Sequence, residues 1–271
     1  MKYNMLRFPG FRDRAVTLSY DDGVIYDQKL LEIIKKYSLK CTFNINSGLL
    51  SGENRKMTKE QALALYDDSC EIACHGEKHL KLTDVDSARA VYEIITDRKN
   101  LEEWFCRRVN GMAYAFGSFD ENAIKILQQC GIKYSRTTIS SHNFDLPENW
   151  LALKPTCHHT EGNLFELVDK FLNYSEPEWK KQPQVFYLWG HSYEFADNDN
   201  WEILEQFCEK VANKEYIWYA TNVQIYDYVK AFEKLEFSVD SKRIFNPTST
   251  TLYLRVFGKD VVIRGGEEVS L

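Results

Sequence analysis

The stretch AVTLSYDDG (15–23) is a mostly apolar, β-branched run that ends in two aspartates and a glycine. Such a run is typical of a strand that is buried on both faces of a parallel sheet. The residues up to position 37 then place apolar side chains at helical spacing, and KCTFNIN (40–46) has the pattern of a second strand. The chain therefore opens with a β-α-β unit whose first strand brings Asp21 and Asp22 to its carboxyl end.

The same alternation continues along most of the chain. Further predicted strands are CEIAC (70–74), GMAYAF (111–116), IKYSRTT (132–138), LALKPTC (151–157), QVFYLW (184–189) and EYIWYAT (215–221). Amphipathic stretches lie between them, among them a long helix with Val91, Ile94, Ile95, Leu101 and Trp104 at helical spacing. Seven or eight such units need crossover connections, so they predict an α/β protein with parallel strands in a closed barrel rather than an open sheet.

The pattern changes after about residue 235. The segments FSVD (237–240), TLYLRVFG (251–258) and KDVVIRGG (259–266) alternate apolar and polar residues with period two, which is typical of antiparallel strands. We therefore expect a barrel domain over residues 1–235 and a small β appendage, residues 236–271, packed on the barrel.

Composition limits the function classes. The 271 residues carry 34 Lys and Arg against 40 Asp and Glu, a net charge of −6 without a basic stripe, which argues against nucleic acid as a partner. No apolar run reaches the roughly 18 residues of a membrane span, so we expect no membrane partner. The first residues lack an apolar signal core, and the seven scattered Cys favour reduced thiols. We expect a cytoplasmic protein, with an extracellular one as the alternative.

Candidate functional side chains lie where predicted strands end, as is usual in parallel α/β proteins. Five of the six histidines do so; they are His75, His79, His158, His159 and His191. Asp21 and Asp22 are adjacent and point in different directions. One carboxylate is therefore able to ligate a cation while the other stays ionised as a base. The alternative is that they cap the helix that follows.

His75 and His79 are four residues apart, a spacing that lets both imidazoles reach one ion. With Asp22 they make a two-histidine, one-carboxylate set that leaves positions open for water and substrate. The alternative is a pair of loop histidines bonded to backbone. The nearby Cys70 and Cys74 fall on one strand face with an isoleucine between them, so we expect buried thiols rather than ligands.

His191 follows the apolar run VFYLW and is a candidate proton donor to a leaving group. A structural or capping histidine is the alternative. Glu194 is a candidate to orient His191 or to bind substrate. Arg136 lies inside a strand exit, where an unpaired charge would be costly, so we expect it to pair with a carboxylate, first of all Asp21.

Aromatic and histidine side chains near these exits are candidates to contact substrate. Phe116, Trp189 and Tyr193 are candidates for an aromatic wall against a sugar face, with ordinary core packing as the alternative. One of His158 and His159 is expected to line the pocket, and we choose His159. Packing of both is the alternative.

These motifs together resemble the polysaccharide deacetylase family, the NodB-homology group known as carbohydrate esterase family 4. TLSYDDG (17–23) resembles its first motif, usually written TFDDG, and HGEKH (75–79) is similar to its H-[ST]-x-x-H motif. YAFGSFDENAIKIL (114–127) resembles the third motif, an Arg-Pro-Pro-Tyr-Gly stretch that leads into a helix. YLWGHSYEF (187–195) falls where the family has a Leu-x-x-His motif. The four segments occur in family order.

The resemblance implies a distorted (β/α)7–8 barrel that removes acetyl groups from N-acetylated sugars or polysaccharides. It implies that Asp21 is the general base, that His191 is the general acid, and that the nucleophile is a water bound to one divalent ion. Zinc is expected, with cobalt or nickel as alternatives. The implied ligands are Asp22, His75 and His79. The Phe116 N–H, with Gly117 beside it, would help to hold the oxyanion.

Two departures from the family pattern matter. The third motif's arginine should fall near Ala113 and is absent, and we expect Arg136 to supply that charge to Asp21. The fourth motif, Asp-x-x-Asp-Trp, is not recognisable, which leaves Glu194 as a possible partner of His191. The alternatives are an amidohydrolase acting on a non-sugar amide, a catalytically inactive carbohydrate-binding relative and, because of the ligand set, an iron oxygenase.

Overall fold

The central sheet of the computed structural model contains eight parallel strands, and the model describes residues 3–177 and 179–271. The strands are β2 (Arg14–Asp21), β3 (Cys41–Ile45), β4 (Glu71–Cys74), β5 (Gly111–Ala113), β6 (Tyr134–Arg136), β7 (Cys157–His158), β8 (Gln184–Gly190) and β9 (Ile217–Tyr219). Their order is β6-β5-β4-β3-β2-β8-β7, and β9 pairs with the first half of β2. Every pairing in this sheet is parallel, as the alternation of predicted strands and helices required.

The sheet curls into a barrel that is closed only by a distorted segment. Leu153 donates its N–H to Ser135 O (3.0 Å) and accepts from the N–H of Thr137 (2.8 Å), which joins this segment to β6. Three residues later, Thr156 donates to Tyr187 O (2.9 Å) on β8. The segment predicted as one strand over 151–157 is thus a short 3-10 helix, η4 (Trp150–Ala152), an irregular link and the two-residue β7. The distorted α/β barrel is confirmed.

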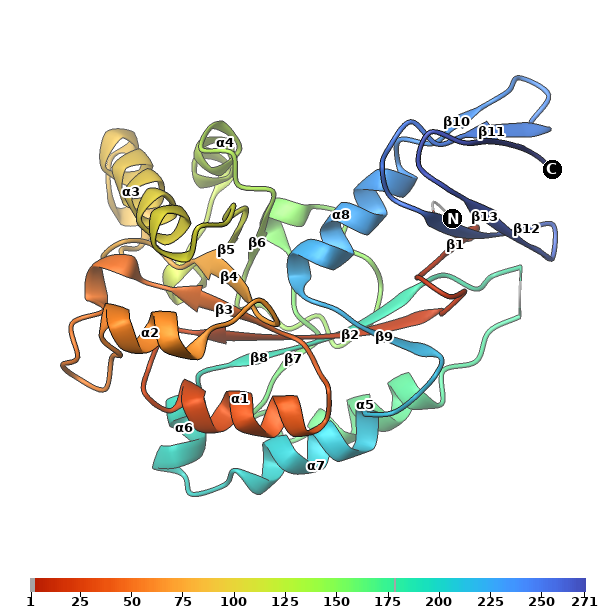
Figure 1. The fold of residues 1–271 in the computed structure, drawn as a ribbon. Coiled ribbons are helices and arrows are strands. Elements are labelled where there is room, and N and C mark those ends of the chain that lie inside the picture. Colours follow the sequence, from red (N-terminus) through yellow and green to blue (C-terminus); the bar gives the residue numbers. More distant parts are fainter. Residues whose placement is uncertain (1–2, 178) are drawn as a thin grey trace.

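Helices cover both sides of the sheet. They are α1 (Asp27–Lys36), α2 (Lys59–Leu65), α3 (Ser87–Phe105), α4 (Glu121–Gln129), α5 (Leu164–Leu172), α6 (Ser192–Asp197), α7 (Glu202–Val211) and α8 (Asn222–Phe232). Figure 1 shows α1, α5 and α7 below the sheet and α3 and α4 above it. Three further 3-10 helices are η1 (Ser47–Leu49), η2 (Leu82–Asp84) and η3 (Ala115–Gly117).

The face that α3 buries differs from the predicted one. Its buried side chains are Ala90, Glu93, Ile94, Asp97 and Leu101. Val91 and Ile95, which the apolar spacing placed on the buried face, are exposed. The reason is that two carboxylates occupy positions of the buried stripe, where an apolar pattern does not reveal them.

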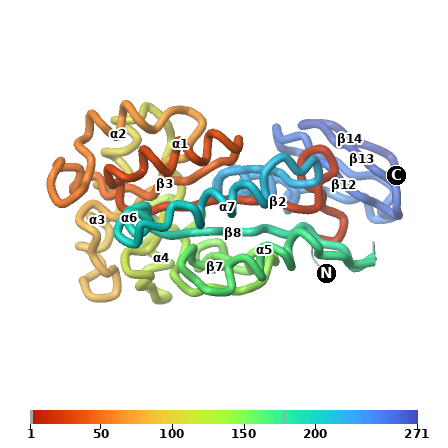
Figure 2. Tube along the Cα trace, turned by 90° about the horizontal axis from the view of Figure 1, so that it is seen from below, coloured from red at the N-terminus to blue at the C-terminus, as the bar shows by residue number. Residues whose placement is uncertain are grey.

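The C-terminal segment forms two small antiparallel sheets. One contains β10 (Glu236–Phe237), β11 (Arg243–Phe245) and β14 (Glu268–Ser270), and the other contains β12 (Leu252–Val256) and β13 (Lys259–Ile263). The second sheet takes its third strand, β1 (Leu6–Arg7), from the start of the chain. Figures 1 and 2 show this β region at one end of the molecule, away from α3. The division of the chain at residue 235 stays a prediction.

The core has two parts. The larger one lies between the barrel and its helices and contains Cys70 and Cys74 as buried thiols, as predicted. The second joins the other side of β8 to α8, β1 and β12. In the part of the chain that the structure describes, no helix is both long and apolar enough to cross a membrane.

Candidate active site

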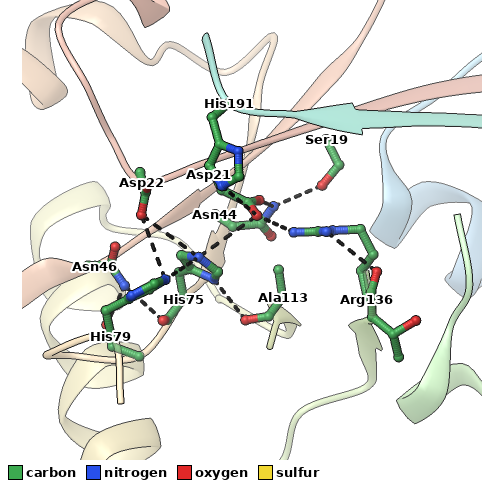
Figure 3. Close-up of polar contacts among 12 residues, drawn as sticks. Ser19, Asp21, Asp22, Asn44, Asn46, His75, His79, Ala113, Arg136 and His191 are labelled. Carbon is green, nitrogen blue, oxygen red and sulfur yellow. Dashed lines mark hydrogen bonds and ion pairs between the residues drawn. The ribbon is translucent and has the colours of Figure 1, made fainter. Parts of the chain in front are cut away.

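Asp21 is the last residue of β2 and is buried at the carboxyl end of the barrel strands (Figure 3). Its Oδ1 accepts a hydrogen bond from Asn44 Nδ2 at 2.8 Å, and its Oδ2 accepts from a terminal nitrogen of Arg136. Burial raises the pKa of Asp21, but the charge of Arg136 and the neighbouring His75 outweigh it, so the pKa lies below its usual value. Asp21 therefore stays ionised.

Arg136, at the end of β6, forms the ion pair with Asp21 that the sequence predicted. The guanidinium is fully buried and lies 4.1 Å from the centre of the Trp189 ring, an arrangement that favours the cation. Trp189 is on β8, so Arg136 contacts residues from opposite parts of the curled sheet. This contact depends on the closing of the barrel.

His75, His79 and Asp22 bring one donor atom each to the same space (Figure 3). The two Nε2 atoms lie 3.1 Å apart, and Asp22 Oδ1 lies 3.9 Å from each. His75 Nδ1 is 2.9 Å from the carbonyl oxygen of Ala113 and donates to it, which leaves the Nε2 lone pair facing the other two groups. This donor set suits a divalent cation such as zinc.

The backbone at two of these ligands adopts an unusual conformation. Asp22 has φ 87° and His79 has φ 58°, in the left-handed region that non-glycine residues rarely adopt. Burial lowers the pKa of His75, and burial and the proximity of His75 lower that of His79 to about 4. Both imidazoles are therefore neutral near pH 7, the form in which histidine ligates metals.

Lys56 is a site residue that the sequence analysis missed. Its Nζ lies 3.1 Å from Asp22 Oδ1 and donates to the Asp22 carbonyl oxygen at 2.8 Å. Lys56 lies in the loop between η1 and α2, and no motif in that loop marks it. Asn44 was missed as well, although it is a polar residue near the end of a predicted buried strand, which is a detectable signal.

His191 follows β8 and lies just before α6. Its Nε2 is 4.0 Å from Asp21 Oδ2, on the side that faces the ligand cluster. Its backbone N–H donates to Glu194 Oε2 at 3.0 Å, and its Nδ1 lies 3.4 Å from the same oxygen. Burial lowers the pKa of His191, but Glu194 and Asp21 reverse this effect, so the pKa is raised.

Glu194 is shared by three imidazoles. Besides His191, the Nε2 atoms of His158 and His159 each lie 3.2 Å from its Oε2. These neighbours overcome burial and hold the pKa of Glu194 well below its usual value. The Thr160 N–H donates to His158 Nδ1 at 3.2 Å, so the proton of His158 is on Nε2 and faces Glu194. The donor atoms of His158, His191 and Glu194 thus converge on one place beside Asp21.

The predicted substrate-contacting residues divide into two groups. Phe116 is 62% exposed at the rim with its ring centre 4.5 Å from that of His79, and the Tyr193 ring lies beside His191. Trp189 is only 7% exposed and His159 only 2%, so both lie behind the rim. His159 is stacked against Phe195.

Gly117 follows Phe116 with φ 66°, and a Cβ there would come within 2.1 Å of Thr138. The turn after β5 therefore requires a glycine at this position.

Residues 9–135 match the family model described as polysaccharide deacetylase, which covers Asp21, Asp22, His75, His79 and Phe116. This part of the chain, somewhat less than half of it, is therefore similar to polysaccharide deacetylases. Arg136 and His191 lie beyond the matched residues. No curated protein sequence matches the chain.

Two solved structures share the fold of this chain. A putative polysaccharide deacetylase from Mycobacterium smegmatis superimposes with a TM-score of 0.60 at 16% identity, over 84% of this chain and 94% of that one. A family 4 carbohydrate esterase from Streptomyces lividans in complex with acetate gives 0.52 at 13% identity, over 76% and 91%. The Streptococcus pyogenes deacetylase PplD in complex with acetate matches with a TM-score of 0.43 at 22% identity, and the match covers 45% of this chain and 55% of PplD.

Proposed function

We propose that this protein is a metal-dependent deacetylase that removes the acetyl group of an N-acetylated sugar or polysaccharide. The observation that carries the proposal is the convergence of two sets of groups. Donor atoms of Asp22, His75 and His79 face one another, and Asp21 Oδ2 and His191 Nε2 lie 4.0 Å apart beside them. A candidate base and a candidate acid thus flank a candidate metal site.

Asp22, His75 and His79 would hold one divalent cation, zinc first and cobalt or nickel as alternatives. When bound, such a cation polarises the acetyl carbonyl and makes a coordinated water more acidic. The residues support this role because both imidazoles are neutral and His75 is oriented by the Ala113 carbonyl. An oriented, neutral histidine is the usual form of a metal ligand.

Asp21 would take the proton from the attacking water. Its Oδ1 accepts from Asn44 and its Oδ2 accepts from Arg136, and Oδ2 also lies 3.8 Å from His75 Nε2 and 4.0 Å from His191 Nε2. The proton would go to this carboxylate on the side that faces the ligand cluster. Arg136 keeps Asp21 ionised and ready to accept a proton.

His191 would protonate the departing nitrogen from Nε2. Nδ1 faces Glu194, and that carboxylate stabilises the protonated ring that a general acid needs. Trp189 and His159 would contribute behind the rim, the first by holding Arg136 and the second by packing against Glu194.

Substrate contacts would come from the exposed rim. The Phe116 ring is open to solvent and next to His79, a position from which it would stack on a sugar face. The N–H of Phe116, beside Gly117, would help to hold the oxyanion. Tyr193 and Glu194 would contact the sugar from the His191 side.

The test is acetate release from N-acetylglucosamine monomer and oligomers and from an acetylated non-sugar amine. The protein is first stripped with chelator and then given zinc, cobalt or nickel. We expect metal-dependent release from at least one sugar substrate and loss of release in Asp21→Asn and His191→Gln. His142→Gln, a histidine outside the site, is the matched control and should retain activity. Release from the amine alone would support the non-sugar amidohydrolase, and no release from any substrate would contradict the proposal.

A further inference from the structure

The loop that carries His75 and His79 lies against α3, and this helix presents two buried carboxylates to it. Glu93 and Asp97 are one helical turn apart, and both side chains are fully buried. The oxygens of both carboxylates accept hydrogen bonds from backbone N–H groups of the surrounding loops. Burying a carboxylate is costly unless such bonds are made, so these contacts tie the loop to the helix.

Glu93 holds the second half of the loop. Its Oε1 accepts from the N–H of Lys78 at 2.7 Å and from that of Leu80 at 3.1 Å, the residues on either side of His79. Its Oε2 is buried and makes no hydrogen bond. Glu93 therefore uses a single oxygen to fix the backbone around one metal-ligand candidate.

Gly76 leaves the space that the Glu93 carboxylate occupies. A Cβ at this position would lie 2.8 Å from Glu93 Oε1, and the residue has φ 84°. The missing side chain at Gly76 and the buried Glu93 carboxylate on α3 are therefore two parts of one arrangement.

Asp97 holds the first half of the loop and uses both oxygens. Its Oδ2 accepts from the N–H of His75 at 2.9 Å, and its Oδ1 accepts from the N–H of Ser47 at 2.7 Å. The carbonyl oxygens of the same loop are also bonded. Asn46 Nδ2 donates to the carbonyls of His75 and Gly76 at 2.8 and 2.9 Å.

We propose that Glu93 and Asp97 are positioning residues that set the backbone of the 75–80 loop, so that the His75 and His79 Nε2 atoms face one point before any cation arrives. This inference rests on the proposed function, because it assigns a metal to that point. Neither carboxylate touches the cation. Each acts through backbone N–H groups, as the outer groups that orient metal ligands do.

Glu93 accepts hydrogen bonds with one oxygen and Asp97 with both, so we expect the two positions to differ in whether an amide can replace the carboxylate. Glu93→Gln keeps a carbonyl oxygen for both N–H groups and places its amide nitrogen where Oε2 has no partner, so cobalt affinity should stay close to the wild-type value. Glu93→Ala removes the acceptor. Asp97→Asn turns one of two needed acceptors into a donor that faces an N–H. We expect Glu93→Ala and Asp97→Asn to weaken cobalt binding by about 10- to 100-fold.

The experiment is a titration of metal-free protein with Co²⁺, followed by its visible absorption. Glu103→Ala, an exposed glutamate on the same helix, is the matched control and should bind as the wild type does. Loss in Glu93→Ala with rescue in Glu93→Gln is the expected result, since a general loss of stability would not be rescued by the amide. Equal affinity in wild type, Glu93→Ala and Asp97→Asn would overturn the positioning role. A wild-type protein that binds no cobalt would overturn the proposed function and this inference with it.

Hydrogen exchange on the metal-free wild type provides a readout that needs no variant to fold. The amide protons of Lys78 and Leu80 should exchange slowly although the loop is part-exposed, because Glu93 accepts both. Exchange of these two amides at the rate of a free loop would contradict the assignment.

Discussion

Arg136 and Asp21, 115 positions apart in the sequence, form an ion pair inside the barrel. They lie on β6 and β2, which three other strands separate in the sheet. The curvature of the sheet therefore brings the pair together. Arg136 thus places a buried positive charge from β6 against the carboxylate at the end of β2.

Arg136→Met should reduce acetate release while the metal stays bound. Without the guanidinium, burial raises the pKa of Asp21, and a protonated carboxyl cannot accept a proton from water. We expect turnover to fall on the order of 100-fold and the unfolding free energy to fall by about 3–5 kcal/mol, as when other buried pairs are broken. Turnover, metal content and urea unfolding are measured together. Arg98→Met removes a more exposed pair and should leave turnover unchanged; unchanged turnover in Arg136→Met would refute the role.

Glu194→Gln should move the alkaline limb of the pH–rate profile to lower pH. The Glu194 carboxylate raises the pKa of His191 against the effect of burial, so its removal lowers that pKa. A general acid must carry its proton, and activity is lost as pH rises through its pKa. The limb should therefore lie at lower pH in the kcat/KM profile of the variant than in that of the wild type. Glu60→Gln, on the exposed side of α2, is the control and should give the wild-type profile. An unshifted limb in Glu194→Gln would show that Glu194 does not set the pKa of His191.

Lys56→Met should strengthen metal binding. The ammonium lies 3.1 Å from the Asp22 oxygen that faces the two imidazoles, so it competes with a cation for this charge. We expect the cobalt dissociation constant to fall roughly fivefold, which is a modest electrostatic effect near a protein surface. Lys99→Met, an exposed lysine on α3, controls for net charge. Weaker binding in Lys56→Met would mean that the lysine supports the site rather than competing for it.

Gly190→Ala should destabilise the protein. A Cβ at this position would lie 2.0 Å from His159 Nδ1, and the His159 ring is buried and packs against both Tyr20 and Phe195. Overpacking of this kind costs about 1–3 kcal/mol of unfolding free energy. Gly162→Ala places its methyl group in open space and is the matched control. Equal stability of the two variants in thermal unfolding would show that His159 is free to shift.

The parallel barrel was predictable because each buried strand is an apolar run bounded by a helix of clear periodicity. The structure also contains a capping box at Thr58–Gln61, where α2 begins, and a left-handed Gly131 after α4, and these residue types are typical of helix ends. β1 was not predictable, because a strand of two residues is too short to show an alternation of apolar and polar residues. Its pairing with β12 depends on how the ends of the chain meet.

The site was predictable where its residues sit at strand ends, and less so where they come from helices or loops. Asp21 is the last residue of β2 and His75 directly follows β4, so topology alone brings them together. Glu93 and Asp97 were hidden because Val91 and Ile95 suggested a different buried face for α3. Lys56 reaches the site from a loop, and only the three-dimensional course of that loop brings it to Asp22.

The central claim is that Asp22, His75 and His79 hold one divalent ion, and elemental analysis of the purified protein tests it most directly. The protein is analysed as isolated and after reconstitution with zinc, cobalt or nickel, beside His75→Ala and the control His142→Ala. The account predicts about one ion per chain in the wild type and the control, and a clear loss in His75→Ala. Absence of bound metal in the reconstituted wild type, or equal metal in His75→Ala, would contradict it.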